Sequence, residues 1–392
     1  MAAAILRPDD ARLAVTQDWP PFVLVAGLLL IGLVADGDGL FAYAGTRLAR
    51  IARSGILLYA GAAVIIAAVT VTLNLDTSVA FLTPVLVYTA RSRAGGQGRP
   101  AVDNRAVDNT AVDSGLVDRA AAGAALLYAC LMLSNAGSLL LPGSNLTNLI
   151  VLGHLRLTGG QFVARMWLPW LAALAATAAV VAAGERRSLA RLAGPARPVR
   201  PANPASPARP VLGIGLAAVL AATALVVTLT DPAIPVAAVG VTAAGIRLAQ
   251  RRERPDQVRD VLGVPVLAGL LGVTIALGVL GRAWSGPEAL LSHLGSWAAA
   301  GVAALAAVGV NNLPAASLLA ARAPDHPFSL LVGLNIGPNL CVTGSLAWLL
   351  WLRAARGAGA APSLARATRL GAVAVPLAMA AALGALALTG TH

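Results

Sequence analysis

The sequence predicts an all-α polytopic membrane protein. Of its 392 residues 58% are hydrophobic, the mean hydropathy is +0.77, and only 12% are charged, whereas soluble domains have about 25% charged residues. The formal net charge is +12, and all 29 basic residues are arginines. These arginines lie in polar segments between apolar runs. That distribution is typical of cytoplasmic loops and argues against a nucleic-acid-binding surface.

The first half, residues 1–184, opens with an apolar run over residues 19–34, where Pro20 and Pro21 suit a helix start. Residues 40–53 are apolar on one side and carry three arginines at three-residue spacing on the other. This pattern favours an amphipathic arm at the membrane interface, and a plain cytoplasmic helix end would give the same pattern.

Residues 55–90 contain two apolar limbs separated by the polar sequence LNLDTS at 73–78. The second limb is shorter than the roughly 20 residues that a helix needs to cross a bilayer. Arginines flank the whole unit on both sides, so both of its ends are expected on the same side of the membrane. A re-entrant hairpin with its tip at 74–77 satisfies both observations.

A broken crossing follows at residues 120–155, where the polar sequence PGSNLTN at 142–148 interrupts an apolar run. Residues 101–118 repeat AVDN-like units and are expected to form a solvated loop. After a further span at 162–183, the Pro- and Arg-rich residues 185–210 are interpreted as a cytoplasmic linker between two halves.

The second half, residues 211–392, repeats this order after two spans at 211–248 that have no counterpart in the first half. Its expected elements are a basic loop at 247–259, a span at 261–280, a weakly amphipathic piece at 287–297, a hairpin at 298–321 with the tip VNNLPAA, a broken crossing at 328–352 and a last span at 370–388. With most arginines placed in the cytoplasm, the two hairpins enter from opposite faces of the cell membrane. The sequence therefore predicts an inverted-topology repeat with two re-entrant hairpins and two broken transmembrane helices.

In such a fold the two hairpin tips and the two breaks converge near the middle of the membrane. Helix N-termini there offer partial positive charge and free N–H donors, and Asn, Ser and Thr side chains add oxygens. A site of this kind suits a small oxygen-rich solute.

Asp76 is the only acidic residue expected within the membrane depth. A carboxylate there suggests proton exchange or Na⁺ binding, because a buried charge is expensive; capping of the second hairpin limb is the alternative role. Cys341 lies inside the second break, where it could contact a thiophilic solute or act as a small buried hydrophobe. Trp348 and Trp351 are expected to anchor the cytoplasmic interface.

Other classes of function find no support in the sequence. Cys130 and Cys341 form no metal-ligand spacing. There is no glycine-rich phosphate loop and no arrangement of nucleophile, base and acid. We therefore expect a protein that is not an enzyme and that has no cofactor and no bound metal.

Four segments carry a family resemblance: LNLDTSVAFLTPVL (73–86), PGSNLTNLIV (142–151), VNNLPAASLL (310–319) and NIGPNLCVTGSLAWLLWL (335–352). Together they resemble the ArsB-type arsenite efflux pumps of the ion transporter superfamily, which also holds dicarboxylate and Na⁺/H⁺ carriers. The last segment points to the arsenite branch. Cys341 departs from this pattern, since Thr or another small residue is expected there.

The resemblance implies export of arsenite or antimonite as neutral trihydroxides by proton antiport. Its partners would be this small solute, protons or Na⁺ and the lipid bilayer, with an ATPase subunit or a second copy in a homodimer as further candidates. It places substrate contacts at Asn74, Thr77, Ser144, Asn145, Thr147, Asn148, Asn311, Asn312, Asn339, Thr343, Gly344 and Ser345, with ion or proton coupling at Asp76. Two alternatives remain open: a Na⁺- or H⁺-coupled, dicarboxylate-like anion permease, and a non-transporting membrane scaffold.

Overall fold

The computed structural model describes residues 8–94, 123–192 and 213–390. Every regular element in these ranges is a helix, which confirms the predicted all-α class. Five helical segments are long and apolar enough to cross a membrane: Pro8–Gly37, Gly55–Thr72, Gly159–Gly184, Pro255–Ala283 and Leu364–Leu388. The protein is therefore a polytopic membrane protein. The repeat-containing loop predicted at 101–118 and most of the linker at 185–210 lie outside the described residues.

The helices follow the predicted order. The first half contains α2 (Pro8–Gly37), α3 (Leu40–Ile51), α4 (Gly55–Thr72), α5 (Leu75–Ala94), α7 (Ala124–Gly137), the 3₁₀ turn η1 (Pro142–Ser144), α8 (Leu146–Leu152), α9 (Gly159–Gly184) and α10 (Arg186–Arg191). The second half contains α11 (Ile214–Thr228), α12 (Ala233–Ala249), α13 (Pro255–Leu262), α14 (Val264–Ala283), α15 (Gly286–Ser292), α16 (Ser296–Val310), α17 (Asn312–Leu319), α18 (Pro327–Ile336), the 3₁₀ turn η2 (Gly337–Leu340), α19 (Leu346–Gly357) and α20 (Leu364–Leu388).

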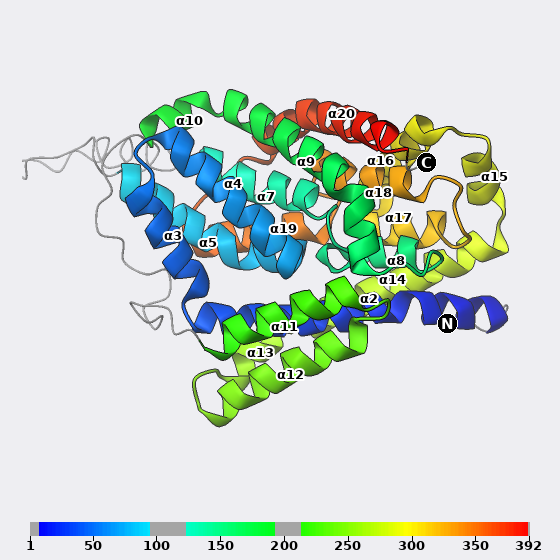
Figure 1. Cartoon of the computed structure of the whole chain (residues 1–392), viewed down its shortest axis with the longest axis horizontal. Coiled ribbons are helices and arrows are strands. Elements are labelled where there is room, and N and C mark those ends of the chain that lie inside the picture. The colour runs from blue at the N-terminus through cyan, green and yellow to red at the C-terminus, as the bar shows by residue number, and fades with distance from the viewer. Residues whose placement is uncertain (1–7, 95–122, 193–212, 391–392) are drawn as a thin grey trace, which may run out of the picture.

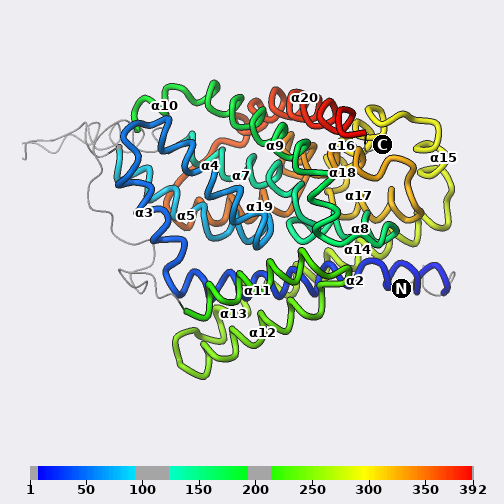
Figure 2. The backbone as a smooth tube through the Cα atoms, viewed as in Figure 1, coloured from blue at the N-terminus to red at the C-terminus, as the bar shows by residue number. Residues whose placement is uncertain are grey.

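Two groups of helices make up the molecule (Figure 1). Helices α2 and α11 to α14 form a flanking layer, in which α2 packs against each of the other four. Helices α4, α5, α7 to α9 and α16 to α20 form a core bundle. Within it the α4–α5 pair lies toward one end and the α16–α17 pair toward the other (Figures 1 and 2). These pairs occur where hairpins are predicted, while their depth in a membrane and their inverted relation remain predictions.

Glycines let the flanking layer pack backbone against backbone. A Cβ added at Gly27 of α2 would lie 2.6 Å from the Cα of Ala237 on α12, and one added at Gly240 would lie 2.4 Å from the carbonyl oxygen of Gly27. No real Cβ tolerates such distances. The two helices are therefore in direct main-chain contact where they cross, and no larger residue fits at either position.

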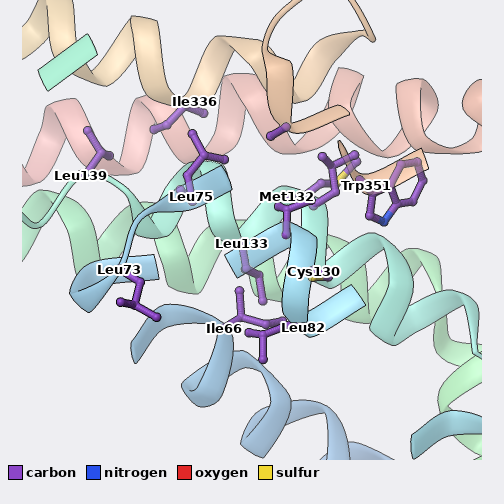
Figure 3. Packing of buried hydrophobic residues seen from close by; sticks show 14 of the residues in the cluster. Ile66, Leu73, Leu75, Leu82, Cys130, Met132, Leu133, Leu139, Ile336 and Trp351 are labelled. Atoms are coloured by element: carbon purple, nitrogen blue, oxygen red, sulfur yellow. The ribbon is translucent and has the colours of Figure 1, made fainter. Parts of the chain in front are cut away.

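The centre of the core bundle is a continuous apolar cluster (Figure 3). Ile66 of α4, Leu82 of α5 and Leu133 of α7 meet there, and each side chain is no more than 1% exposed. This packing fixes the first hairpin against the first broken helix. It thereby fixes the position of the polar tip of that hairpin within the core bundle.

Three boundary predictions were wrong. The first helix begins at Pro8, so Pro20 and Pro21 lie inside α2 and not at its start. The second limb of the first hairpin, α5, has 20 residues, because it continues through the arginines of its last turn. The basic stretch at 247–259 is not simply a loop, since Arg247 belongs to α12 and Pro255–Leu262 forms α13.

The tryptophans of α19 were also wrongly predicted. Trp348 and Trp351 are both 0% exposed, so neither anchors an interface. Their indole N–H groups donate to the carbonyl oxygens of Pro338 and Leu127, at 2.8 Å and 2.9 Å. Burial of both rings with satisfied donors explains why an apolar and aromatic stretch follows the second break.

Arg247 is the centre of a buried ion cluster in the flanking layer. Its guanidinium lies 3.1 Å from the Asp38 carboxylate and 3.9 Å from that of Glu253. The other Asp38 oxygen accepts a 2.8 Å hydrogen bond from the N–H of Gly215 at the start of α11. Burial raises the pKa of Glu253 above its ordinary value, although Arg247 acts in the opposite direction. The cluster therefore links α2, α11 and α12 through charge.

We expect Arg247→Met to destabilise the protein by about 3–5 kcal/mol, because it leaves the Asp38 carboxylate buried without its cation. Thermal unfolding of the detergent-solubilised protein measures this as a lower midpoint. The double variant Arg247→Met/Asp38→Asn should recover part of the loss, since Glu253 is then the one carboxylate of the cluster left without its cation. An unchanged midpoint in the single variant would contradict the assigned role of the cluster.

Candidate functional site

Four helices begin around one small cavity. The starts of α5, α8, α17 and α19 meet there, and two leucines of α14 close it from the flanking layer. The lining residues are Leu75, Asp76, Asn145, Leu146, Leu267, Leu270, Asn311, Asn312, Leu313, Ser345 and Leu346. The cavity has a volume of about 20 Å³, which is room for about one water molecule. The two hairpin tips and the two breaks thus converge at a single point.

The hairpin tips share an unusual backbone. Asn74 and Asn311 have φ angles of 138° and 79°, which residues other than glycine rarely adopt. The ψ angle of Asn311 is 147°, so it lies outside the left-handed α region as well and its backbone is strained. The side-chain oxygen of Asn74 accepts a 2.7 Å hydrogen bond from the N–H of Thr77. That of Asn311 accepts a 3.3 Å hydrogen bond from the N–H of Leu313. Each asparagine therefore both makes the sharp turn and caps the helix that starts at the cavity.

The two breaks have equal length. Twelve residues run from Asn135 to Leu146, NAGSLLLPGSNL, and twelve from Asn335 to Leu346, NIGPNLCVTGSL. Both begin with Asn-x-Gly at the end of one half-helix, pass through a 3₁₀ turn, and end where the next half-helix begins. The 3₁₀ turn lies near the end of the first stretch and near the start of the second, and the internal repeat remains a prediction. Asn145 and Ser345 lie at matching positions of the two stretches, immediately before α8 and α19.

Asn335 joins the two breaks. Its side-chain oxygen accepts hydrogen bonds from Ser138 at 2.6 Å and from Asn145 at 2.7 Å. Its amide nitrogen donates to the side-chain oxygen of Asn148 at 2.9 Å and to the carbonyl oxygen of Leu331 at 2.8 Å. The amide group has two donor hydrogens and two acceptor positions, so every one of them is used. Asn335 is 0% exposed.

Asn135 and Asn339 make a further link between the two breaks. Asn135 of α7 donates to the side-chain oxygen of Asn339 at 2.9 Å, and Asn339 donates to the carbonyl oxygen of Met132 at 3.0 Å. The second hairpin tip is tied to the second break as well, since the N–H of Asn312 donates to the carbonyl oxygen of Gly344 at 2.9 Å. Polar contacts therefore hold the unwound segments together where an apolar helix would not.

The predicted contact residues divide into three groups. Asn145, Asn311, Asn312 and Ser345 line the cavity, together with Asp76, which is 6% exposed. A second group has its side chains bonded elsewhere: Ser144 donates to Val71, Asn148 to Ser138 and Leu141, Asn339 to Met132, and Thr343 to Val308. Gly344 serves through its backbone. The third group, Asn74, Thr77 and Thr147, is buried near the tips but is not part of the lining.

Several buried polar atoms at these tips and breaks have no hydrogen-bond partner. They are the side-chain nitrogen of Asn74 and the hydroxyl oxygens of Thr77, Thr147 and Ser345. An unpaired buried polar group costs about 1–3 kcal/mol. The side-chain oxygen of Asn135 is unpaired as well, and among these residues Ser345 is the one that lines the cavity.

Asp76 does not cap its helix, because that hydrogen bond is made by Asn74. Its carboxyl group lies in the first turn of α5 and lines the cavity. Cys341 is not part of the lining: its sulfur lies 2.9 Å from the Thr343 hydroxyl on a partly exposed stretch. The fully buried thiol in the chain is Cys130.

The sequence did not predict the hydrogen bonds centred on Asn335, which we call the asparagine hub, or the buried carboxylate of Asp18. Asn135 went unnoticed, although its Asn-x-Gly sequence recurs at Asn335 and was a usable signal. Asp18 is 0% exposed inside α2, so Asp76 is not the only acidic residue within the spanning helices. Asp18 was not predicted within a spanning helix because the first apolar run was taken to begin at residue 19.

These observations define a class of protein. Helical hairpins and broken helices that meet at one polar cavity inside an apolar helical bundle are the construction of secondary transporters. A family model described as "Citrate transporter" matches residues 1–351. The chain belongs to this citrate transporter family. No curated protein matches the sequence.

Proposed function

We propose that this protein carries a citrate-like di- or tricarboxylate anion across the membrane, coupled to a cation that Asp76 binds. The observation that carries the proposal is the meeting of helix N-termini at one cavity. Helix α8 has only seven residues, so the argument rests on α5, α17 and α19. Each N-terminus contributes roughly half a positive charge. At α17 the N–H groups of Asn312 and Leu313 are already bonded to Gly344 and Asn311, so this helix attracts an anion through its dipole.

The chemistry of the lining supports an anion without an ionic partner. No lysine or arginine is among the residues that line the cavity, whereas asparagine amides and a serine hydroxyl are. Main-chain N–H groups at helix starts bind carboxylate and phosphate oxygens without any basic side chain. The membership in a citrate transporter family agrees with this substrate class.

Asp76 supplies a reason for coupling. An anion beside an ionised carboxylate is repelled, at a cost that grows as the surroundings become less polar. The anion therefore binds once Asp76 holds a proton or a cation lies between the two. In this way cation binding becomes a condition for anion binding, which is what symport requires.

The cavity in this conformation is too small for citrate, since about 20 Å³ holds about one water molecule. Leu267 and Leu270 of α14 are the lining residues that come from the flanking layer. Separation of the core bundle from these leucines is thus the movement that would widen the site.

Arsenite export by proton antiport is a second candidate. Its support is the uncharged, oxygen-rich lining together with the resemblance of the four polar segments to arsenite pumps. A neutral trihydroxide needs no helix dipole and competes with no carboxylate. The two candidates thus differ in whether the coupling proton travels with the solute or against it.

The test is counterflow in proteoliposomes that contain the purified protein. Vesicles loaded with unlabelled citrate should take up labelled citrate, and an inward proton or Na⁺ gradient should raise accumulation. Arsenite loaded in the same way should not exchange. Arsenite exchange without citrate exchange would reject the proposal in favour of the second candidate, and exchange of neither would reject both.

Ser345→Ala gives a sharper test of the site. Its hydroxyl oxygen has no partner in the described structure, so the substitution should leave thermal stability unchanged. It should raise KM for the transported solute by about five- to tenfold, because one hydrogen bond contributes about 1 kcal/mol. Ser329→Ala is the matched control, since Ser329 is buried in α18 and does not line the cavity. An equal KM in both variants would remove Ser345 from the site.

A further inference from the structure

A second carboxylate is buried far from the cavity. Asp18 of α2 is 0% exposed, and one of its oxygens has no hydrogen-bond partner. The other accepts a 2.8 Å hydrogen bond from the hydroxyl of Ser317 on α17. Ser317 is five residues beyond Asn312, so it lies about 8 Å further along α17 than the residues that line the cavity. Asp18 thus joins the flanking layer to the second hairpin.

The same contact closes one end of the molecule. A Cβ at Gly278 of α14 would lie 2.6 Å from the Ser317 hydroxyl, and one at Gly281 would lie 2.5 Å from the carbonyl oxygen of Leu318. These two glycines let α14 and α17 touch directly. Polar bonds continue the seal, because Gln17 donates to the carbonyl oxygens of Ile150 and Ala320 at 3.0 Å and 2.9 Å. We call this contact of α17 with α2 and α14 the hairpin seal.

The other half of α14 is not sealed in this way. Val264, Val266 and Val273 are 54%, 47% and 51% exposed, and they lie on the turns that carry Leu267 and Leu270 of the cavity lining. These valines do not line the cavity and lie on the outer face of a helix that is apolar enough to cross a membrane, whereas the hairpin seal closes the cavity toward the Ser317 end. A carrier must expose its site to each side in turn, so the hairpin seal has to open during transport.

Opening and closing of the seal changes the surroundings of Asp18. In the closed form an ionised carboxylate would be buried with one oxygen unpaired, which is strongly unfavourable. Charged and titratable groups on the helices around it are Arg282 of α14, Asp10 on α2 itself and His154 after α8. Arg282 donates to Gln17 and to the carbonyl oxygen of Gly278, and its positive charge also attracts the Asp18 carboxylate. The described residues of α17 carry no charge.

We propose that Asp18 is a proton-binding site separate from Asp76, which takes up a proton when the hairpin seal closes and releases it to water when the seal opens. A proton on the free oxygen removes the buried charge and leaves the hydrogen bond with Ser317 intact. The proton comes from, and returns to, the solution at the end of the molecule that carries His154. The pH on that side would then bias the carrier between its two forms.

Cysteine labelling tests this without any substrate, so its result is independent of which solute the carrier moves. Ala320 is 0% exposed inside the seal, so a cysteine at this position should react only when the seal opens. Ala320→Cys is therefore introduced into protein in which Cys130 and Cys341 are replaced by serine. The protein is placed in lipid nanodiscs, where a maleimide reaches both faces. Reactivity is divided by that of Ala361→Cys, an exposed position, which corrects for ionisation of the thiol itself.

Relative labelling of Ala320→Cys should rise at least about threefold between about pH 6 and about pH 8, since proton release favours the open form. Asp18→Asn should label slowly and equally at every pH, because its amide imitates the protonated acid. Asp18→Glu should keep the rise. Ser317→Ala should label faster throughout and still respond to pH, since it weakens the seal without removing the titrating group.

His154→Gln is the decisive control. The His154 ring lies 2.9 Å from the carbonyl oxygen of Ala320, so it is the other group at the seal whose replacement tests the origin of a pH response. Retained pH dependence in this variant, with loss in Asp18→Asn, supports the proposal. It is overturned if His154→Gln abolishes the response, if Asp18→Asn keeps it, or if the parent protein shows none.

Discussion

Asp76→Asn should abolish gradient-driven accumulation of the transported anion while leaving exchange of that anion intact. The amide has the size of the carboxylic acid and stays neutral, so an anion still binds at the cavity. It can neither bind nor release a proton, so a gradient can no longer drive uptake. We expect accumulation to fall at least about tenfold, whereas counterflow stays within about twofold of the parent rate.

The measurement compares the two assays on the same proteoliposomes, with and without an imposed proton or Na⁺ gradient. Asn74→Ser provides a structural control, because it perturbs the cap of α5 and leaves the carboxylate in place. That variant should lower both activities together. Accumulation by Asp76→Asn at the parent level would show that Asp76 has no part in coupling.

Asn335→Leu should be the most damaging single substitution in the core bundle. It removes the oxygen that accepts from Ser138 and Asn145 and the N–H group that donates to the Asn148 oxygen, and each unpaired buried group costs about 1–3 kcal/mol. We expect a loss of at least about 4 kcal/mol of stability and no transport. The thermal unfolding midpoint and counterflow together measure this effect.

Ser138→Ala is the matched control, because it deletes one donor to Asn335 and leaves the oxygen its second bond from Asn145. Its loss should be about 1 kcal/mol, with transport retained. If Asn335→Leu were as mild as Ser138→Ala, the asparagine hub would not be what holds the two breaks together.

The element order was predictable from the sequence because the signals are strong and local. Apolar runs, polar interruptions and arginine-rich connections identify spans, hairpins and breaks without knowledge of their packing. Asn145, Asn311, Asn312 and Ser345 lie in the polar interruptions of apolar runs, and the family resemblance named them as substrate contacts. The structure places each of them immediately before a helix or at its start.

Packing decided what the sequence could not. Asn148 and Asn339 are polar residues within the same interrupted apolar runs as the residues that line the cavity. In the structure their side-chain amides are instead hydrogen-bonded to other helices and turns. Trp348 and Trp351 carry the amphipathic ring that suits an interface, and only their neighbours show that both are buried. The prediction of arsenite as the solute came from segment similarity alone. The comparison with known families supports the coarser class of transporter.

The glycine contact between α2 and α12 has a consequence for movement. Because their main chains touch at Gly27 and Gly240, and because the Arg247 cluster ties α11 to the same pair, the flanking layer resists internal sliding. The boundary between α14 and α17 has the same kind of contact, since Gly278 and Gly281 let the two helices touch directly. A substitution that enlarges Gly27 or Gly240 should therefore force α2 and α12 apart at their crossing and lower the thermal unfolding midpoint.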